Sequence, residues 1–486
     1  MDWGHVLRLI ASEELLSIAG LALLLAAAWA GDKASRAISI AAVAALVGAS
    51  ALVAPLLCDG AAASSIFYGQ LRVDAFAAYA KLLIYGSAIA ALMVAPVFFE
   101  RVKAMRAEYP VLVLFAALGM GIMVSATDLM TLYIGLEMNS LAAYVLAAFL
   151  RNDERSVEAG LKYFVLGALA SGILLFGMSL TYGFAGSTSF EGIRGALSGD
   201  LSMGMVVAIT FVLAGLAFKI SAVPFHMWTP DVYEGAPTPV TMFFASAPKV
   251  AAMALTMRVT LDAFGTQVHA WQQIVIFASI ASIIVGALGA IGQTNIKRLL
   301  AYSSINNVGF ILIGLAAATP QGAAAMLIYL AIYVAMTVAG FVAVLMLKDE
   351  NGEPVELIAD LAGLSRHRKV LSACIAMTMF SLAGIPPLLG FWGKFVVFQA
   401  AVQAGLILLA AIGIAASVIG AFYYLKVVKV LYFDEPANKV TGKSDWAHQA
   451  LLALMTLFIS PLGYLLTKWL GALSATAAAA LFHAAV

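Results

Sequence analysis

The chain has 486 residues, of which 63% are hydrophobic and only 11% are charged, whereas an ordinary soluble domain is about 45–50% apolar and about 25% charged. A soluble fold of this size could not bury so much apolar surface, so the composition indicates an integral membrane protein. The 27 basic and 26 acidic residues leave a net charge of +1, which does not favour a nucleic acid or a strongly acidic ligand.

Apolar stretches long enough to cross a bilayer, about 20 residues each, predict about fourteen membrane-spanning helices. The first stretch follows a mixed-charge N-terminus without a small-residue cleavage site, so we expect a retained span rather than a signal peptide. In chain order the predicted spans are 15–30, 37–57, 74–99, 110–127, 129–150, 157–183, 203–228, 239–262, 271–291, 298–318, 321–347, 370–402, 405–432 and 447–470.

The Lys and Arg residues of the connecting loops predict the orientation. If the loop after the first span is cytoplasmic, seventeen basic residues fall on the cytoplasmic side and five on the other, as the positive-inside rule requires. Both termini are then periplasmic, in a multi-pass protein of the bacterial inner membrane. Five lysines remain within the predicted spans, namely Lys81, Lys162, Lys219, Lys249 and Lys394.

A charge at the bilayer centre costs about 2.5–3.5 kcal/mol, so charged residues inside spans indicate an ion or proton path, or else structural ion pairs. Glu137, in Tyr-Ile-Gly-Leu-Glu-Met-Asn-Ser, is the one carboxylate deep within a predicted span, and we expect it to pair with a buried lysine of a neighbouring helix. Lys81 is different, because it lies about two turns from Asp74 on one helix face. Snorkelling or a local ion pair would explain Lys81.

Two predicted spans contain helix breakers beside a lysine. Pro224 follows Lys219 in the seventh span, and Pro386 and Pro387 precede Lys394 in the twelfth. Proline removes an intrahelical hydrogen bond and leaves carbonyls that need a polar partner. Paired breaks in corresponding halves are typical of a transport site in an inverted repeat, although two incidental kinks are the alternative.

The two breaks are five spans apart, and a repeat of an odd number of helices must enter the membrane from the opposite side. The sequence therefore predicts an all-α, polytopic fold with two inverted five-helix repeats, each containing a broken helix and each opening a half-channel to one face. The predicted segments are an N-terminal three-helix segment (1–109), the first repeat (110–262), the second repeat (263–432), and a C-terminal helix and tail (433–486).

Histidine and cysteine offer little metal chemistry. His226 follows Pro224 and could relay protons or hydrogen-bond a carbonyl freed by the break, and the sequence leaves both open. The two cysteines, Cys58 and Cys374, lack metal-type spacing. We therefore expect no metal, haem or other cofactor to be bound by this chain.

Three stretches carry a family resemblance. Residues 223–241 (VPFHMWTPDVYEGAPTPVT), 295–305 and 135–141 closely resemble the signature of the antiporter-like membrane subunits of respiratory complex I, the proton-translocating NADH:quinone oxidoreductase. Within this family the N-type subunits, counterparts of mitochondrial subunit 2, match best. The chain ends soon after the fourteenth predicted span, it has Lys394 where M-type subunits have a glutamate, and Lys162 precedes a tyrosine as in N-type subunits.

The resemblance implies roles for individual residues. They are a glutamate–lysine pair of the input half-channel (Glu137 and Lys219), a linking lysine (Lys249), an output lysine (Lys394), a modulating lysine (Lys162) and a connecting histidine (His226). For Lys297, at the mouth of the tenth span, a proton role and an interfacial anchor are both open. FMN, iron–sulfur clusters and quinone would belong to the whole complex, and the partners would be its other membrane subunits, neighbouring antiporter-like subunits and lipid.

Two other functions fit the same pattern. The chain could be a subunit of a multi-subunit sodium/proton antiporter, which shares the broken-helix plan, or a scaffold whose buried charges only fix helix packing.

Overall fold

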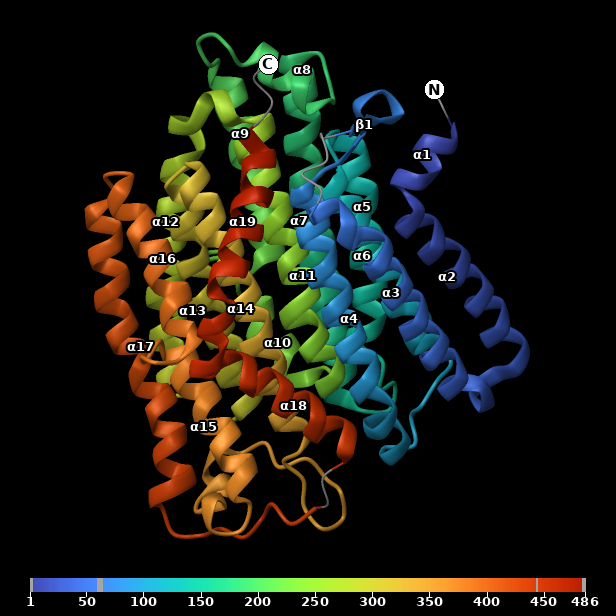
Figure 1. Cartoon of the computed structure of the whole chain (residues 1–486), viewed down its shortest axis with the longest axis vertical. Coiled ribbons are helices and arrows are strands. Elements are labelled where there is room, and N and C mark those ends of the chain that lie inside the picture. Colours follow the sequence, from blue (N-terminus) through green and yellow to red (C-terminus); the bar gives the residue numbers. More distant parts are fainter. Residues whose placement is uncertain (1–2, 59–63, 443–444, 483–486) are drawn as a thin grey trace.

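The computed structural model describes residues 3–58, 64–442 and 445–482, and helices make up almost all of it (Figure 1). The helices of the N-terminal part and first repeat are α1 (Trp3–Leu9), α2 (Ala11–Ala30), α3 (Ser35–Cys58), α4 (Ala75–Arg101), α5 (Glu108–Ser125), α6 (Leu129–Ala147), α7 (Glu154–Ala185), α8 (Phe190–Ala196), α9 (Met203–Ile220), α10 (Trp228–Gly235) and α11 (Thr238–Arg258). The remaining helices are α12 (Val268–Ile291), α13 (Ile296–Ala316), α14 (Pro320–Leu345), α15 (Lys369–Ala383), α16 (Leu389–Gln403), α17 (Ile407–Phe433), α18 (Trp446–Ile459) and α19 (Thr467–Phe482). One short antiparallel hairpin, β1 (Ser64–Ile66) with β2 (Leu71–Val73), precedes α4.

The number of spans agrees with the sequence prediction, but two of the predicted limits are wrong by seven residues or more. Among the described residues, twelve continuous stretches are long and apolar enough to cross a membrane. The first stretch joins α2 and α3, and the broken pair α15–α16 adds a further crossing. The seventh span does not end at 228, because α10 continues it to Gly235. The last span does not end at 470, because α18 and α19 carry it to Phe482 with an interruption at Pro461. The interrupting turns, at 221–227 and Pro461–Leu466, lie inside the two predicted spans, so each span contains more residues than one continuous helix would.

The backbone confirms the inverted repeat. Asp128 caps α6 and forms a β-bridge with Ser189 in the segment after α7, and Asn295 caps α13 and forms the same bridge with Leu357 in the segment after α14. The first bridge lies at the end of the molecule that carries α8, and the second lies at the opposite end, near the start of α15 (Figure 1). Corresponding helices of the two repeats therefore run in opposite directions.

Both predicted helix breaks are present and have the same backbone plan. The residues that follow α9 and α15, Ser221 (φ 63°) and Gly384 (φ 83°), are both in the left-handed region. A proline follows three residues later in each case, Pro224 or Pro387, preceded by a cis peptide bond. Glycine adopts this conformation readily, whereas Ser221 occupies it with its hydroxyl engaged by neighbouring side chains.

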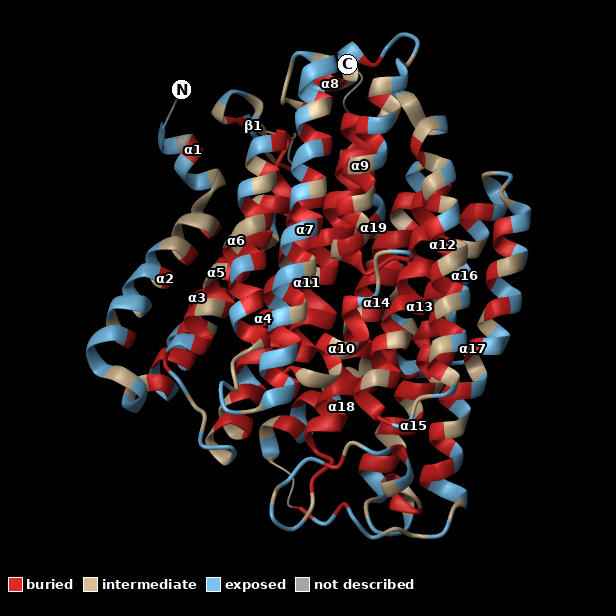
Figure 2. Cartoon of the chain, turned by 180° about the vertical axis from the view of Figure 1, so that it is seen from behind, coloured by how far each residue is buried: buried red, intermediate tan, exposed pale blue. Residues whose placement is uncertain are grey.

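Burial divides the helices into a central and a peripheral set. Almost every residue of α11, α13 and α14 is buried, whereas α2, α3, α7 and α17 expose long apolar faces (Figure 2). Helices that are apolar on all sides are stable only when protein or lipid surrounds them. The central helices, which carry Lys249 and Lys297, thus lie in the protein interior, away from lipid.

Close helix contacts hold α6 in place. A Cβ atom on Gly119 of α5 would lie 2.7 Å from the Gly135 carbonyl oxygen of α6, and one on Gly135 would lie 2.8 Å from the Gly119 oxygen. Only glycine allows two helix backbones to approach so closely. The contact fixes the position of the α6 turn that carries Glu137.

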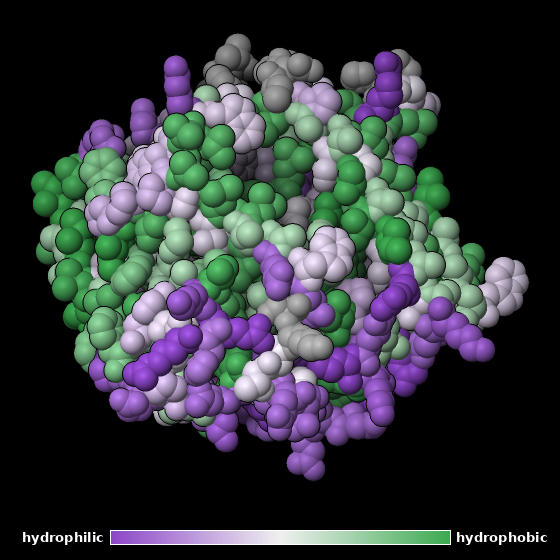
Figure 3. Space-filling view, turned by 60° about the horizontal axis from the view of Figure 1, so that its bottom comes forward, coloured by the Kyte–Doolittle hydropathy of each residue, from purple (hydrophilic) through white to green (hydrophobic). Residues whose placement is uncertain are grey.

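The hydrophilic surface and the described chain ends lie at opposite ends of the bundle. Hydrophilic side chains gather at the end of the molecule formed by α18 and the connection between α14 and α15, whereas the sides are mainly hydrophobic (Figure 3). The start of α1 and the end of α19 both lie at the opposite end (Figure 1). The described part of the chain therefore starts and ends on the same side of the bundle.

Two buried ion pairs attach the N-terminal helices, and they correct the prediction for Lys81. Its Nζ lies 2.5 Å from Glu13 Oε1 of α2, so its partner is not Asp74. Asp74 instead binds Arg258 of α11 through two hydrogen bonds of 2.8 and 2.9 Å, with both side chains fully buried. Glu137 is consequently not the one buried carboxylate of the chain.

We expect Arg258→Met to destabilise the fold by about 3–5 kcal/mol, because it leaves the Asp74 carboxylate buried without a counter-charge. The measurement is the midpoint of thermal unfolding of the solubilised protein and its yield in the membrane. Arg36→Gln is the control, since the Arg36–Glu100 pair is largely exposed. Equal yields and midpoints for the two variants would contradict the prediction.

Candidate functional site

Lys219 lies in the last turn of α9, directly before the first helix break. Its Nζ donates hydrogen bonds to Ser140 Oγ of α6 at 2.9 Å and to Ser171 Oγ of α7 at 3.1 Å. The two acceptors are neutral hydroxyls on neighbouring helices. The ammonium is thus solvated by protein dipoles rather than by a direct counter-ion.

Glu137 does not form the direct ion pair that the sequence predicts. It lies one turn before Ser140 on α6, and Ser140 takes the hydrogen bond from Lys219 instead. Within the described residues Glu137 has no ion-pair partner, and its buried Oε1 accepts no hydrogen bond.

Lys249 of α11 caps the carbonyl end of α9. Its Nζ donates to the Ile220 carbonyl oxygen at 2.9 Å and to Ser221 Oγ. The ammonium also lies over aromatic faces, 5.7 Å from the Trp228 ring centre and 6.0 Å from that of Tyr233. These contacts supply the donor that the last carbonyls of an interrupted helix lack.

Lys394 does the same at the second break. From the second turn of α16 its Nζ donates to the carbonyl oxygens of Leu382 (3.1 Å) and Ala383 (3.0 Å), which end α15, and to Ser417 Oγ of α17 (3.1 Å). The ring centre of Phe310 lies 4.5 Å from the ammonium. A groove of about 610 Å³ between α16 and α17 leads to this amine from the side of the bundle.

Lys297 follows the same rule at a third helix end. Its side chain is only 4% exposed, and its Nζ donates to the carbonyl oxygens of Glu234 and Ala236, both at 2.8 Å, where α10 ends. The Glu356 carboxylate lies 3.6 Å away. Three lysines thus cap three carbonyl ends, whose partial negative charge favours a cation.

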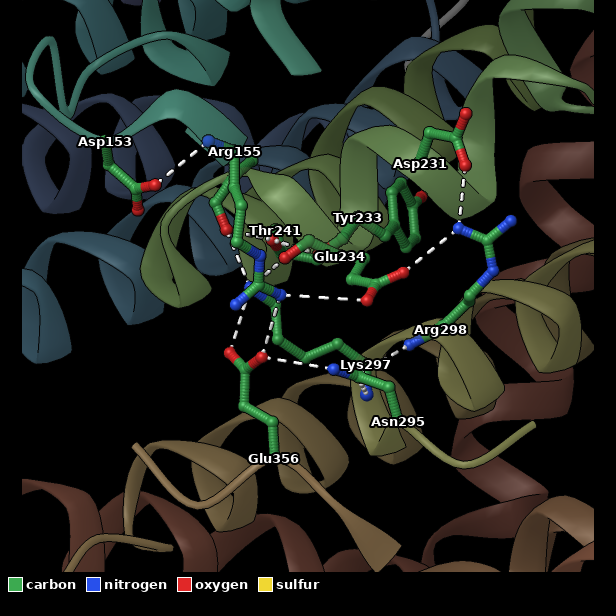
Figure 4. A network of polar contacts seen from close by, with 11 residues as sticks. Asp153, Arg155, Asp231, Tyr233, Glu234, Thr241, Asn295, Lys297, Arg298 and Glu356 are labelled. Atoms are coloured by element: carbon green, nitrogen blue, oxygen red, sulfur yellow. Dashed lines mark hydrogen bonds and ion pairs between the residues drawn. The ribbon is translucent and has the colours of Figure 1, made fainter. Parts of the chain in front are cut away.

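A network of ion pairs surrounds the end of α10 and joins the two repeats (Figure 4). Arg298 of α13 contacts Asp231 at 2.7 Å and Glu234 at 3.0 Å, and Arg155 of α7 contacts Glu356 at 3.0 Å. Together with Lys162 and Glu158, most of these side chains line an open polar pocket of about 200 Å³.

Electrostatics in this network favour charged groups. Burial of Glu356, in the connection between α14 and α15, raises the pKa of its carboxyl, but Lys297 and Arg155 lower it more, so the pKa lies below its ordinary value of 4.5. Asn295 also donates a hydrogen bond to Glu356 at 3.1 Å. The carboxylate therefore stays ionised beside two cations.

The structure separates the remaining predicted residues. Lys162 of α7 contacts Asp231 and Glu158, each at 2.7 Å, so it belongs to the network at the end of α10 and not to the surroundings of Lys219. His226 lies in the break itself, and among the described residues its buried Nδ1 has no hydrogen-bond partner. Pro224 is exposed there.

Sequence reasoning missed the acidic members of the network. Asp231 and Glu234 stand within the motif at 223–241, but the prediction placed them in a loop because the seventh span was ended at 228. Their signal was the spacing after Pro224, since a helix resumes a few residues beyond such a break. Glu356 had no comparable signal, because the connection between α14 and α15 has no regular pattern.

Comparison with known proteins gives the class first. The NADH:quinone oxidoreductase/Mrp antiporter transmembrane family matches residues 126–420, which contain both broken helices. A chain of the Mrp complex from Dietzia sp. shares the fold with a TM-score of 0.86 at 24% identity, over 99% of this chain and 98% of that one. The protein is thus an antiporter-like membrane subunit.

Closer relatives give the family. NADH-quinone oxidoreductase subunit N of Erythrobacter litoralis is 68% identical over 100% of both chains, and that of Sphingopyxis alaskensis is 57% identical over 98% of this chain and 99% of the relative. A chain of respiratory complex I from Thermus thermophilus has a TM-score of 0.80 at 33% identity, over 96% of this chain and 99% of that one. The chain belongs to the NADH-quinone oxidoreductase subunit N family, a family of bacterial inner-membrane proteins, and its partners are the other membrane subunits of complex I. The resemblance found in the sequence is confirmed.

We expect Glu356→Gln to lower the thermal stability of the complex at pH 7 but to have little effect in acid. The depressed pKa means that the stabilisation is complete above about pH 4.5 and is lost as pH falls through the lower pKa of the folded state. The measurement is the inactivation temperature of wild-type and variant complex between pH 3 and pH 7. A difference that stays constant down to pH 3 would contradict the prediction.

Proposed function

We propose that the chain carries protons through two half-channels, with electron transfer in other subunits of complex I as the driving reaction. The observation that carries this proposal is the set of neutral partners at both helix breaks. In the described structure Lys219, Lys249 and Lys394 are held by hydroxyls and carbonyls, not by carboxylates. A lysine held this way can lose its proton without leaving an unpaired carboxylate in the interior.

The roles of the individual residues are those that the family resemblance implies. Glu137 and Lys219 serve the input half-channel, Lys249 links it to the second repeat, and Lys394 serves the output side. Lys162, His226 and Lys297 are auxiliary, since two of them belong to the network around α10 and the third stands in the break. The repeats that form the half-channels are assigned to 110–262 and 263–432, between the N-terminal segment 1–109 and the C-terminal segment 433–486.

The subunit acts in this proposal as a translocase without a redox centre. Its two cysteines, Cys58 and Cys374, are too few for the four thiolates of an iron–sulfur cluster. FMN, the clusters and quinone are accordingly assigned to partner subunits. The hydrophilic end of the bundle in Figure 3 is assigned to the cytoplasm and both termini to the periplasm, in keeping with the distribution of Lys and Arg.

Sodium/proton exchange is the second candidate function, and the shared fold of the Mrp complex favours it. The test is NADH-driven transport by the purified complex in vesicles with and without sodium. Proton uptake that does not change with sodium supports the first function, and uptake that requires sodium supports the second.

We expect Glu137→Gln to assemble normally and to lower NADH-driven proton transport by about tenfold or more, because the neutral amide cannot exchange a proton. The measurement is proton uptake by reconstituted complex, per assembled complex. The control is Glu191→Gln, an exposed glutamate of α8. If the variant assembles poorly but the assembled fraction transports protons normally, the result would instead support a scaffold role for this chain.

We expect Lys219→Arg to be as damaging to transport as Lys219→Met. Arginine stays protonated and methionine carries no proton, so neither can load and release one. The same vesicle assay measures the effect, with the exposed Lys468→Arg as control. Wild-type transport in either Lys219 variant would refute the role given to this residue.

A further inference from the structure

An open groove of about 590 Å³ lies where α2 of the N-terminal segment meets α5, α6 and α7 of the first repeat. We call it the α5–α7 groove. Its volume falls within the range of about 300–1,000 Å³ that is usual for sites of small ligands. Its walls are mainly apolar, with Phe115, Val145 and Phe164 among them, and Glu108 and Arg151 are its two charged lining residues. The groove can thus hold a long apolar group together with a charged one.

The two charged residues mark one end of the groove. Glu108 is the first residue of α5, and Arg151 follows the end of α6. This is the hydrophilic end of the bundle in Figure 3, because α4, which leads into α5, ends at Arg101 beside Gly352 of the connection between α14 and α15. The mouth of the groove therefore lies where the membrane surface meets the bundle.

From this mouth the groove runs into the hydrophobic part of the bundle. Between Glu108 and Phe115 it follows α5 for seven residues, which is about 10 Å at a rise of 1.5 Å per residue. The hydrocarbon of one leaflet is about 15 Å deep. A charged mouth at the surface and an apolar channel toward the membrane centre match the orientation of a phospholipid in the leaflet.

The charges at the mouth are available to a ligand. Both side chains are exposed, and within the described residues neither has an ion-pair or hydrogen-bond partner, nor do the two pair with each other. The charge of Arg151 acts on the nearby Asp32, but Asp32 is already paired with Arg106. Arginine binds phosphate through parallel hydrogen bonds, and an ionised carboxylate accepts hydrogen bonds from an ammonium group. The mouth thus offers one partner for each charge of a zwitterionic headgroup.

Close helix contacts shut the groove off from the interior. A Cβ atom on Gly160 of α7 would collide with Ala148 of α6, and one on Gly167 would collide with the hydroxyl of Tyr144, which lines the groove. The two helices therefore leave no gap between them at this level. A chain bound in the groove stays on the outer side of the repeat, away from Lys219.

We propose that the α5–α7 groove binds a glycerophospholipid of the phosphatidylethanolamine class. The Arg151 guanidinium donates to the phosphate, the Glu108 carboxylate accepts from the primary ammonium, and an acyl chain lies along α5. An anionic headgroup would bring its negative charge to Glu108 without an ammonium to offset it, so Glu108 sets the preference between lipids.

The experiment uses two photoreactive lipids with the same acyl chains, one with a phosphatidylethanolamine headgroup and one with a phosphatidylglycerol headgroup. Each is added in trace amount to the complete complex in phosphatidylcholine vesicles, and the labelled peptides of this chain are identified by mass spectrometry. We expect the ethanolamine lipid to label segments 108–115 and 144–164 about fivefold more than the glycerol lipid, as one favourable charge at the membrane surface provides.

The groove between α16 and α17 is an internal control for this labelling. Its volume is similar, about 610 Å³, and its walls are also mainly apolar, but Lys394 is its one charged lining residue. Without a carboxylate it should show no preference for the ethanolamine lipid. Equal labelling of the α5–α7 groove by both lipids overturns the proposal. So does the absence of label there, because a neighbouring subunit then covers the groove.

Glu108→Gln tests the headgroup preference. We expect the ratio of ethanolamine to glycerol label in the α5–α7 groove to fall from about five to about one, because the amide carries no charge to pair with the ammonium. Glu154→Gln is the matched control, since Glu154 is the exposed first residue of α7 but does not line the groove. A ratio that Glu108→Gln leaves unchanged overturns the proposal.

Val145→Trp tests the groove itself, because the larger side chain fills it. Leu141→Trp is the control, since Leu141 stands one turn earlier on α6, is 57% exposed where Val145 is 53% exposed, and lies outside the groove. We expect only Val145→Trp to lower the label in segments 108–115 and 144–164, and equal label in both variants overturns the proposal. If Val145→Trp does not assemble, the exposed substitution Glu108→Gln decides. The readout is lipid labelling rather than proton transport, so the outcome is independent of the proposed function.

Discussion

The contact between a lysine ammonium and the carbonyl end of an interrupted helix governs this structure. A helix that stops inside a membrane protein leaves carbonyls without donors, and no bulk water is present to satisfy them. Lys249, Lys394 and Lys297 each supply that donor, at the ends of α9, α15 and α10 respectively. The same contact stabilises the breaks and keeps three amines in the interior, so fold and proposed function depend on one interaction.

The two repeats have the same backbone plan at their helix breaks but carry different side chains there. Seven residues after the proline of each break stands a charged residue, Asp231 after Pro224 and Lys394 after Pro387. Asp231 lies in an open ion-pair network, whereas Lys394 is buried against carbonyls. Corresponding positions therefore carry opposite charges in opposite surroundings. Two identical repeats would give the proposed entrance and exit for protons the same chemistry. The difference between Asp231 and Lys394 gives them different chemistry.

Local signals in the sequence predicted much of the fold. Prolines at 224, 386 and 387 act on their own helices, and the hydropathy of a span indicates how deep a lysine lies. The helix breaks and the lysines beside them could therefore be predicted from the sequence. The hydrogen-bond partners of these lysines could not be predicted. Ser140 and Ser171 reach Lys219 from two other helices, and an ordinary buried serine carries no mark of such a contact. The pairing of Lys81 with Glu13 was missed for a related reason. Glu13 lies on another helix, whereas Asp74 is on the same helix face as Lys81 and was taken as its partner.

The bond between Asp74 and Arg258 has a consequence for biosynthesis. The two residues are 184 positions apart, so Asp74 leaves the ribosome long before its partner exists. At about 5–20 residues per second, translation takes roughly ten to forty seconds to bridge that interval. Throughout that time the α4 start must stay in contact with water or the insertion machinery, and its docking into the bundle follows the arrival of α11. The N-terminal helices are thus synthesised first, but the ion pair that fixes α4 to α11 forms later.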